Sequence, residues 1–175
     1  MPEDQIIFDA KYLRLVKRKD WEFVHRKHIT GIVGIIAITE GRELVLVEQF
    51  RIPLGKPVIE IPAGLVGDTP GSEHESLADA ANRELEEETG YHAGKMRLLT
   101  TGASSAGLTD ELITLFLATG LTRTGPGGGD PSENITVHVV PLPQVPAFLA
   151  RRAENGAIID LKVYSALYFA SQEIL

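Results

Sequence analysis

The stretch RELEEETGY, Arg83–Tyr91, decides how this chain is interpreted, because four of its nine residues are glutamates. Alanine and leucine dominate the residues before it and predict a helix. Ser72 is the expected N-cap, with Glu75 three residues later in a capping box, and Gly90 is the expected left-handed C-cap. Like charges on adjacent helical positions repel one another. The function of these glutamates therefore depends on whether each carboxylate points to solvent or to the buried side of the helix.

A helical projection at about 100° per residue separates the glutamates into two groups. Glu86 and Asp79 fall on the far face, as expected for a solvated acidic helix. Glu84 and Glu88 lie one turn apart, at the edge of the apolar stripe that contains Leu85. Two carboxylates on the buried side repel at reduced dielectric and are costly to desolvate. Protonation relieves that cost, and so does a divalent cation such as Mg²⁺, which binds carboxylate oxygens.

Composition limits the class of protein. The chain has 175 residues, the size of one domain, and a formal net charge of −7. This acidity argues against non-specific nucleic-acid binding, which needs a basic surface. The absence of cysteine excludes disulfides, thiolate zinc sites and a cysteine nucleophile. No signal-peptide pattern or membrane-length apolar run is present, so we expect a soluble, cytoplasmic protein without a membrane partner.

The order of strands and helices predicts an α/β sandwich around a mixed sheet, because regular βαβ alternation is missing. We expect two N-terminal strands in residues 1–30 and one main domain in residues 31–175. The expected strands are Ile6–Val16, Trp21–His28, Gly31–Ile38, Glu43–Phe50, Val58–Ile61, Lys95–Thr101, Glu111–Ala118 and Asn134–Val140. The helices expected at the end of the chain are Leu142–Glu154 and Asp160–Gln172.

The glutamate run resembles a Nudix box, whose pattern is G-x5-E-x7-R-E-U-x-E-E-x-G-U with U a bulky apolar residue. Glu75, seven further residues and Arg83–Tyr91 match it. The leading glycine departs from the pattern, because its natural match, Gly64, lies ten residues before Glu75 and the expected position holds Thr69. We interpret this as an insertion of five residues within Val66–Gly71. The resemblance implies a Nudix-type α/β/α sandwich.

Other segments resemble the ADP-ribose and nucleoside-diphosphate-sugar pyrophosphatases of that family. They are Trp21–Arg26, Val47–Asp68, Ser105–Glu111 and Ile158–Ala170. ADP-ribose enzymes commonly carry a proline where this chain has Ala106, which favours a wider substrate range that includes GDP-mannose. Related enzymes are dimers, so the resemblance also implies that the N-terminal strands serve in a homodimer.

The resemblance assigns the metal ligands residue by residue. Glu84 and Glu88 would bind Mg²⁺, or Mn²⁺, with Glu87 adjacent and the backbone carbonyl of Ala63 contributing. The metal would bridge the substrate diphosphate and activate a water molecule.

The catalytic set implied by the resemblance is Glu111, Glu87 and Arg83. Glu111 is the expected general base or an additional metal ligand. The alternative for Glu111 is an ordinary glutamate at a strand edge. Arg83 is expected to pair with Glu75 and so to hold the helix and the loop together, although Glu75 also fits a purely capping role.

Three residues are assigned to the substrate. Arg51 would bind the diphosphate with its planar fork of donors, Glu60 would support the pocket, and Trp21 would stack on the base. A surface ion pair is the alternative for Arg51, and a core or interface tryptophan is the alternative for Trp21. The glycine-rich Gly125–Asp130 is interpreted as a flexible loop, because it lacks the Lys-Ser/Thr ending of a phosphate loop and leads into a strand.

The resulting hypothesis is Mg²⁺-dependent hydrolysis of nucleoside-diphosphate sugars to a nucleoside monophosphate and a sugar phosphate. One alternative is another Nudix reaction, on dinucleoside polyphosphates or (d)NTPs. An alternative of a different class is a Nudix-fold module that binds a ligand without catalysis.

Overall fold

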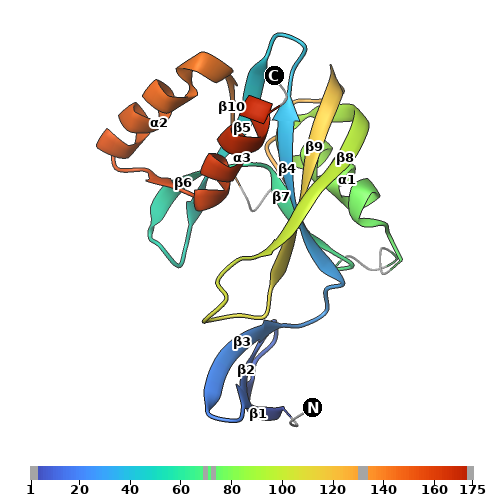
Figure 1. Cartoon of the computed structure of the whole chain (residues 1–175), viewed down its shortest axis with the longest axis vertical. Helices are drawn as coiled ribbons and strands as arrows, with labels where there is room; N and C mark the ends of the chain where they lie inside the picture. Colours follow the sequence, from blue (N-terminus) through green and yellow to red (C-terminus); the bar gives the residue numbers. More distant parts are fainter. Residues whose placement is uncertain (1–3, 69–70, 72–73, 130–133, 173–175) are drawn as a thin grey trace.

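A computed structural model describes residues 4–68, 71, 74–129 and 134–172 (Figure 1). In this part of the chain, eight strands form the main sheet. They are β4 (Gly31–Ile38), β5 (Glu43–Arg51), β6 (Lys56–Glu60), β7 (Ala63–Val66), β8 (Tyr91–Ala103), β9 (Leu112–Arg123), β10 (Thr136–Pro141) and β11 (Ile158–Ile159). The helices are α1 (Leu77–Thr89), α2 (Val145–Glu154) and α3 (Leu161–Gln172), and a 3-10 turn, η1 (Leu142–Gln144), precedes α2.

The sheet is mixed, as predicted, and it divides near its middle. Its order is β11-β6-β5-β4-β9-β8, with β10 paired to β5 and β7 paired to β4. The β4/β9 and β6/β11 pairs are parallel and the others are antiparallel. Strand β4 pairs with β5 only through Ala37 and Ile38, and residues 31–34 of β4 pair with β7 instead. This division separates β5 and β6 from β7 and leaves room for a cavity.

Alternation along the central strands produces two hydrophobic cores, one on each face of the sheet. Val33, Ile35 and Ala37 of β4 pack in the core under α1. Ile36 of the same strand packs in the core that contains residues of α2 and α3. Successive side chains of a strand point to opposite faces, so a continuous apolar run can serve both cores. Figure 1 shows α1 on one side of the sheet and α2 with α3 on the other, which confirms the predicted α/β/α sandwich.

Helix α1 begins later than predicted. Its N-cap is Ser76, whose hydroxyl accepts a hydrogen bond from the backbone N–H of Asp79 at 3.1 Å. The predicted cap, Ser72, lies outside the described residues. Glu75 precedes the helix and its carboxylate pairs with Arg83, so the predicted capping box is wrong. At the other end the prediction is confirmed: Gly90 has φ 72° and its N–H donates to the carbonyl of Glu86.

The N-terminal strands form their own sheet of β1 (Gln5–Asp9), β2 (Leu13–Arg18) and β3 (Trp21–Arg26). Figure 1 shows this sheet projecting from the main body. The predicted single strand Ile6–Val16 is wrong, because the chain turns between β1 and β2, where the N–H of Ala10 donates to the carbonyl of Leu13. A role for this sheet in dimerisation stays a prediction.

Two further differences concern the main sheet. Strand β7, which starts at Ala63 and pairs with β4, was not among the expected strands. Strand β11 was also missed, since it has only two residues. Among the described residues, no helix is both long and apolar enough to cross a membrane.

Candidate active site

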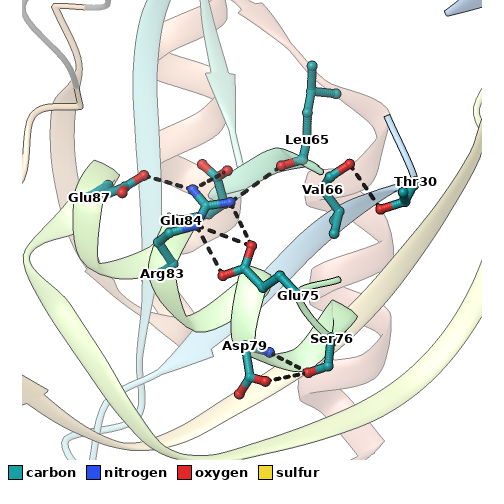
Figure 2. Close-up of polar contacts among 9 residues, drawn as sticks. All are labelled: Thr30, Leu65, Val66, Glu75, Ser76, Asp79, Arg83, Glu84 and Glu87. Carbon is teal, nitrogen blue, oxygen red and sulfur yellow. Dashed lines mark hydrogen bonds and ion pairs between the residues drawn. The ribbon is translucent and has the colours of Figure 1, made fainter. Parts of the chain in front are cut away.

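Arg83 joins three parts of the chain through one guanidinium (Figure 2). Its Nε donates to Glu75 Oε1 at 3.2 Å, in the segment before α1. Its Nη1 donates to Glu84 Oε1 at 2.9 Å and to Glu87 Oε2 at 3.0 Å, both on α1. Its Nη2 donates to the carbonyl of Leu65 in β7 at 3.5 Å. The predicted pairing of Arg83 with Glu75 is therefore confirmed, and two of the box glutamates share the same cation.

The two inward glutamates occupy the positions that the projection predicted. The residue Glu88 is only 4% exposed and its Oε2 accepts the N–H of Ala63 at 3.1 Å. The side chain of Glu84 is 14% exposed. Burial raises the pKa of Glu84 to about 7, although the positive charge of Arg83 acts in the opposite direction. A carboxylate in this environment is poised to gain from a cation. Glu86, by contrast, is exposed on the far face.

A cavity of about 430 Å³ lies where β4 departs from β5. It brings together residues that are far apart in the sequence but were all assigned to the site. They are Arg51, Glu60, Ala63, Glu84, Glu88 and Glu111. The α1 glutamates, the β5 arginine and the loop glutamate therefore border one volume, as a site for a diphosphate and a metal requires.

Arg51 and Glu60 form a two-bonded ion pair between β5 and β6. Arg51 Nε donates to Glu60 Oε1 at 2.5 Å and Nη2 donates to Oε2 at 2.8 Å. The residue Glu60 is 4% exposed, whereas the side chain of Arg51 is 42% exposed. The buried carboxylate orients an arginine that borders the cavity. A role for Glu60 in supporting a bound substrate stays a prediction.

Strand β3 holds the loop that carries Glu111. The N–H of Val24 donates to the carbonyl of Leu108 at 2.8 Å, and His25 Nδ1 lies 2.9 Å from Asp110 Oδ2. Arg26 Nε donates to Glu111 Oε1 at 2.6 Å. Three successive residues of β3 therefore each contact the loop that leads to Glu111, and these contacts determine where the Glu111 carboxylate lies.

Sequence reasoning missed two cationic residues that line the cavity, Arg26 and Lys162. Lys162 Nζ lies 2.7 Å from Asp160 Oδ2 at the start of α3. Both residues lie inside stretches that resemble the pyrophosphatases, WEFVHR and IIDLKVYSALYFA. That resemblance was the available signal, but it did not indicate which residue of each stretch reaches the site.

Three assigned residues lie outside the lining of this cavity: Arg83, Glu87 and Trp21. Arg83 is adjacent to it through its bond with Glu84, and Glu87 bonds to Arg83. Trp21 is 61% exposed, and its Nε1 donates to the carbonyl of Gly107 at 3.2 Å. It borders a separate, smaller cavity together with Ala106. The assigned stacking role of Trp21 stays a prediction.

The donors at the site suit a hard divalent cation that keeps water and substrate ligands. In the part of the chain that the structure describes, no group of three carboxylate or imidazole side chains is arranged to hold a metal by itself. Mg²⁺ is usually bound by one or two carboxylates together with waters and substrate phosphates. Partly buried Glu84 and buried Glu88, one turn apart beside Ala63, supply that smaller set.

A family model described as NUDIX domain matches residues 28–161. This chain belongs to the Nudix family. The chain is 37% identical to the methanol dehydrogenase activator of Bacillus methanolicus, over 83% of this chain and 75% of that protein. It is 41% identical to the ADP-ribose pyrophosphatase of Bacillus subtilis, over 50% of this chain and 45% of that protein.

A solved structure of an ADP compounds hydrolase superposes with a TM-score of 0.73 at 20% identity, over 99% of this Nudix chain and 91% of the other. The comparison supports the fold along nearly the whole chain. The predicted Nudix family, the resemblance to its ADP-ribose pyrophosphatase group and the assignment as a hydrolase are confirmed.

Gly64 provides a direct test of where the Glu84 carboxylate must lie. A Cβ at Gly64 would stand 1.9 Å from Glu84 Cδ, the flexible end of that side chain. We expect Gly64→Ala to fold with a melting temperature close to wild type, because the carboxylate can swing away, but to lose hydrolase activity by about 100-fold. Gly102→Ala is the control, since a Cβ there meets nothing within 4 Å. Equal activity of both variants would contradict this placement of Glu84.

The raised pKa of Glu84 predicts how stability depends on pH without metal. A carboxyl whose pKa is higher in the folded than in the unfolded state stabilises the fold at low pH, and this contribution is lost as pH rises past about 7. Glu84→Gln, with chelator present, should therefore melt above wild type near about pH 9 and lose that advantage near about pH 5.

The matched control for this experiment is Glu86→Gln. Bonds from Thr124 and His92 lower the pKa of exposed Glu86, so its replacement should not raise the melting temperature at high pH. The interpretation of Glu84 is wrong if both variants respond to pH in the same way.

Proposed function

We propose that this chain hydrolyses the diphosphate bond of nucleoside-diphosphate sugars, with Mg²⁺ or Mn²⁺ as cofactor, to a nucleoside monophosphate and a sugar phosphate. One observation carries the proposal: a single cavity is lined by the inward glutamates Glu84 and Glu88, by Glu111 and by Arg51. Anionic metal ligands and a cationic phosphate ligand around one volume suit a substrate that is itself a metal-bound diphosphate.

Glu84, Glu88 and the carbonyl of Ala63 would hold the metal, and Glu87 belongs to the same set through the cation that it shares with Glu84. When bound, the metal offsets diphosphate charge and lowers the pKa of a coordinated water. Arg83 keeps the carboxylates of α1 close together before the metal arrives, because it neutralises part of their mutual repulsion.

Side chains of the protein would accept the proton of the attacking water and bind the phosphate oxygens. Glu111 accepts a proton from the attacking water while Arg26 fixes the position of its carboxylate. The water oxygen bonds to one phosphorus, and the bond from that phosphorus to the bridging oxygen breaks. Arg51, oriented by Glu60, donates hydrogen bonds to phosphate oxygens and stabilises the charge that develops on them.

Trp21 and the N-terminal sheet fit a homodimer in this proposal. Trp21 is exposed and lies outside the cavity of its own chain, as expected of a residue that stacks on a base in the site of a second copy. Ile6, Phe8 and Tyr12 of the same region are also half or more exposed. Ala106 beside Trp21 favours a range of substrates wider than ADP-ribose. The cytoplasmic location stays a prediction.

A substrate panel tests the proposed reaction. Purified protein with Mg²⁺ is given ADP-ribose, GDP-mannose, UDP-glucose, diadenosine polyphosphates and dNTPs, and a phosphatase that acts only on terminal phosphates reports the products. Hydrolysis of the dNTPs is measured instead by the release of pyrophosphate. We expect turnover to concentrate on the diphosphate sugars.

Glu88→Gln is the matched variant for the panel, because it keeps the shape of a buried side chain and removes its charge. It should lose about 100-fold or more of the metal-dependent turnover. Preference for dinucleoside polyphosphates or dNTPs would favour the other Nudix reaction. No turnover on any compound would favour a binding module.

A further inference from the structure

The glycine-rich segment after β9 covers the C-terminal end of α1. The N–H of Gly128 donates to the carbonyl of Glu88 at 2.8 Å, and the N–H of Gly129 donates to the carbonyl of Glu87 at 3.0 Å. The N–H of Thr124 donates to the carbonyl of Gly90 at 2.8 Å. Residues 124–129, which we call the glycine cap, form a loop, as predicted for Gly125–Asp130, and these bonds attach the loop to α1. Asp130 lies outside the described residues.

These bonds complete the last turn of α1. The final four carbonyls of a helix have no partner within the helix. At the end of α1, the carbonyl of Glu86 accepts from the N–H of Gly90. The carbonyls of Glu87 and Glu88 accept from the N–H groups of the glycine cap. Both residues belong to the proposed metal set.

Steric contact explains why the cap is made of glycine. Gly127 has φ 70°, and a Cβ there would lie 2.4 Å from the backbone carbon of Thr89. A Cβ at Gly90 would lie 2.2 Å from the carbonyl oxygen of Gly125. Neither neighbour is a flexible side-chain end, so a larger residue must push the cap away from the helix. A Cβ at Gly125 itself would meet nothing within 4 Å.

We propose that the glycine cap is a positioning element of the metal site. Gly127 allows the cap to lie against α1, and the cap holds the backbone of Glu87 and Glu88 so that their carboxylates meet the metal in one arrangement. The inference rests on the proposed metal role of these glutamates. It extends that role to a segment outside the Nudix box.

Hydrogen exchange on wild-type protein tests the coupling without any substitution. If the cap favours metal binding, metal binding must stabilise the cap to the same extent, because the two equilibria are linked. We expect the amides of Gly128 and Gly129 to exchange about ten-fold more slowly with saturating Mg²⁺ than with chelator. Unchanged exchange in a protein that binds the metal would overturn the proposal.

A substitution in the glycine cap tests the same coupling, because it changes the cap and the affinity for the metal is then measured. Mn²⁺ affinity is measured by electron paramagnetic resonance on substrate-free protein, alongside the melting temperature. Gly127→Ala should weaken Mn²⁺ binding about ten-fold, the scale of losses when outer-shell support is removed. Gly156→Ala, at the end of α2, is the control for backbone strain, since φ is 89° and a Cβ meets nothing within 4 Å. It should lower only the melting temperature.

The outcomes separate this inference from the proposed function. A Gly127→Ala protein that melts earlier but binds Mn²⁺ like wild type would show a purely structural cap and overturn the inference. Failure of wild-type protein to bind Mn²⁺ at all would overturn the metal site itself. If Gly127→Ala does not fold, hydrogen exchange on the wild type decides.

Discussion

The interaction on which the site depends is the sharing of one guanidinium among several carboxylates. Glu84 and Glu88 lie on the inward side of α1, beside Ala63 of β7. Burial disfavours the charge of Glu84 and raises its pKa, and the nearby charges of Glu87 and Asp68 act in the same direction. Arg83 contacts Glu75, Glu84 and Glu87 at once, so it relieves part of this cost and ties the helix to the segment before it and to β7. The compensation is incomplete, because the pKa of Glu84 remains raised, and a divalent cation would complete it.

The sheet supplies the space that this arrangement needs. Strand β4 remains paired with β5 for only two residues and then pairs with β7, so the sheet divides beside the helix that carries the glutamates. Gly64 of β7 lies against the Glu84 carboxylate, which occupies the space that a Cβ at position 64 would need. This contact explains why the family pattern has a glycine before the helix. The contact agrees with the interpretation of Gly64 as the family glycine, although ten residues separate it from Glu75.

Periodicity predicted much of the fold and the core of the site, because both depend on local rules. The 3.6-residue repeat was sufficient to place Glu84 and Glu88 on the buried side, and β-branched runs located β4 and β5. Contacts between distant segments could not be predicted in this way. Nothing near Arg26 indicates that its partner is Glu111, which lies 85 residues later. Composition also did not indicate that residues 125–129 lie against α1, because glycine that permits close backbone packing and glycine in an open loop look the same in a sequence.

We propose that the inward glutamates of α1 are metal ligands, and an anomalous difference map from crystals of the protein soaked in Mn²⁺ would locate the ions themselves. We expect Mn²⁺ peaks within coordination distance of Glu84 and Glu88, next to the carbonyl of Ala63. A map with Mn²⁺ bound only elsewhere, or with no peak while Glu84 remains paired to Arg83, would contradict the metal-ligand role of these glutamates.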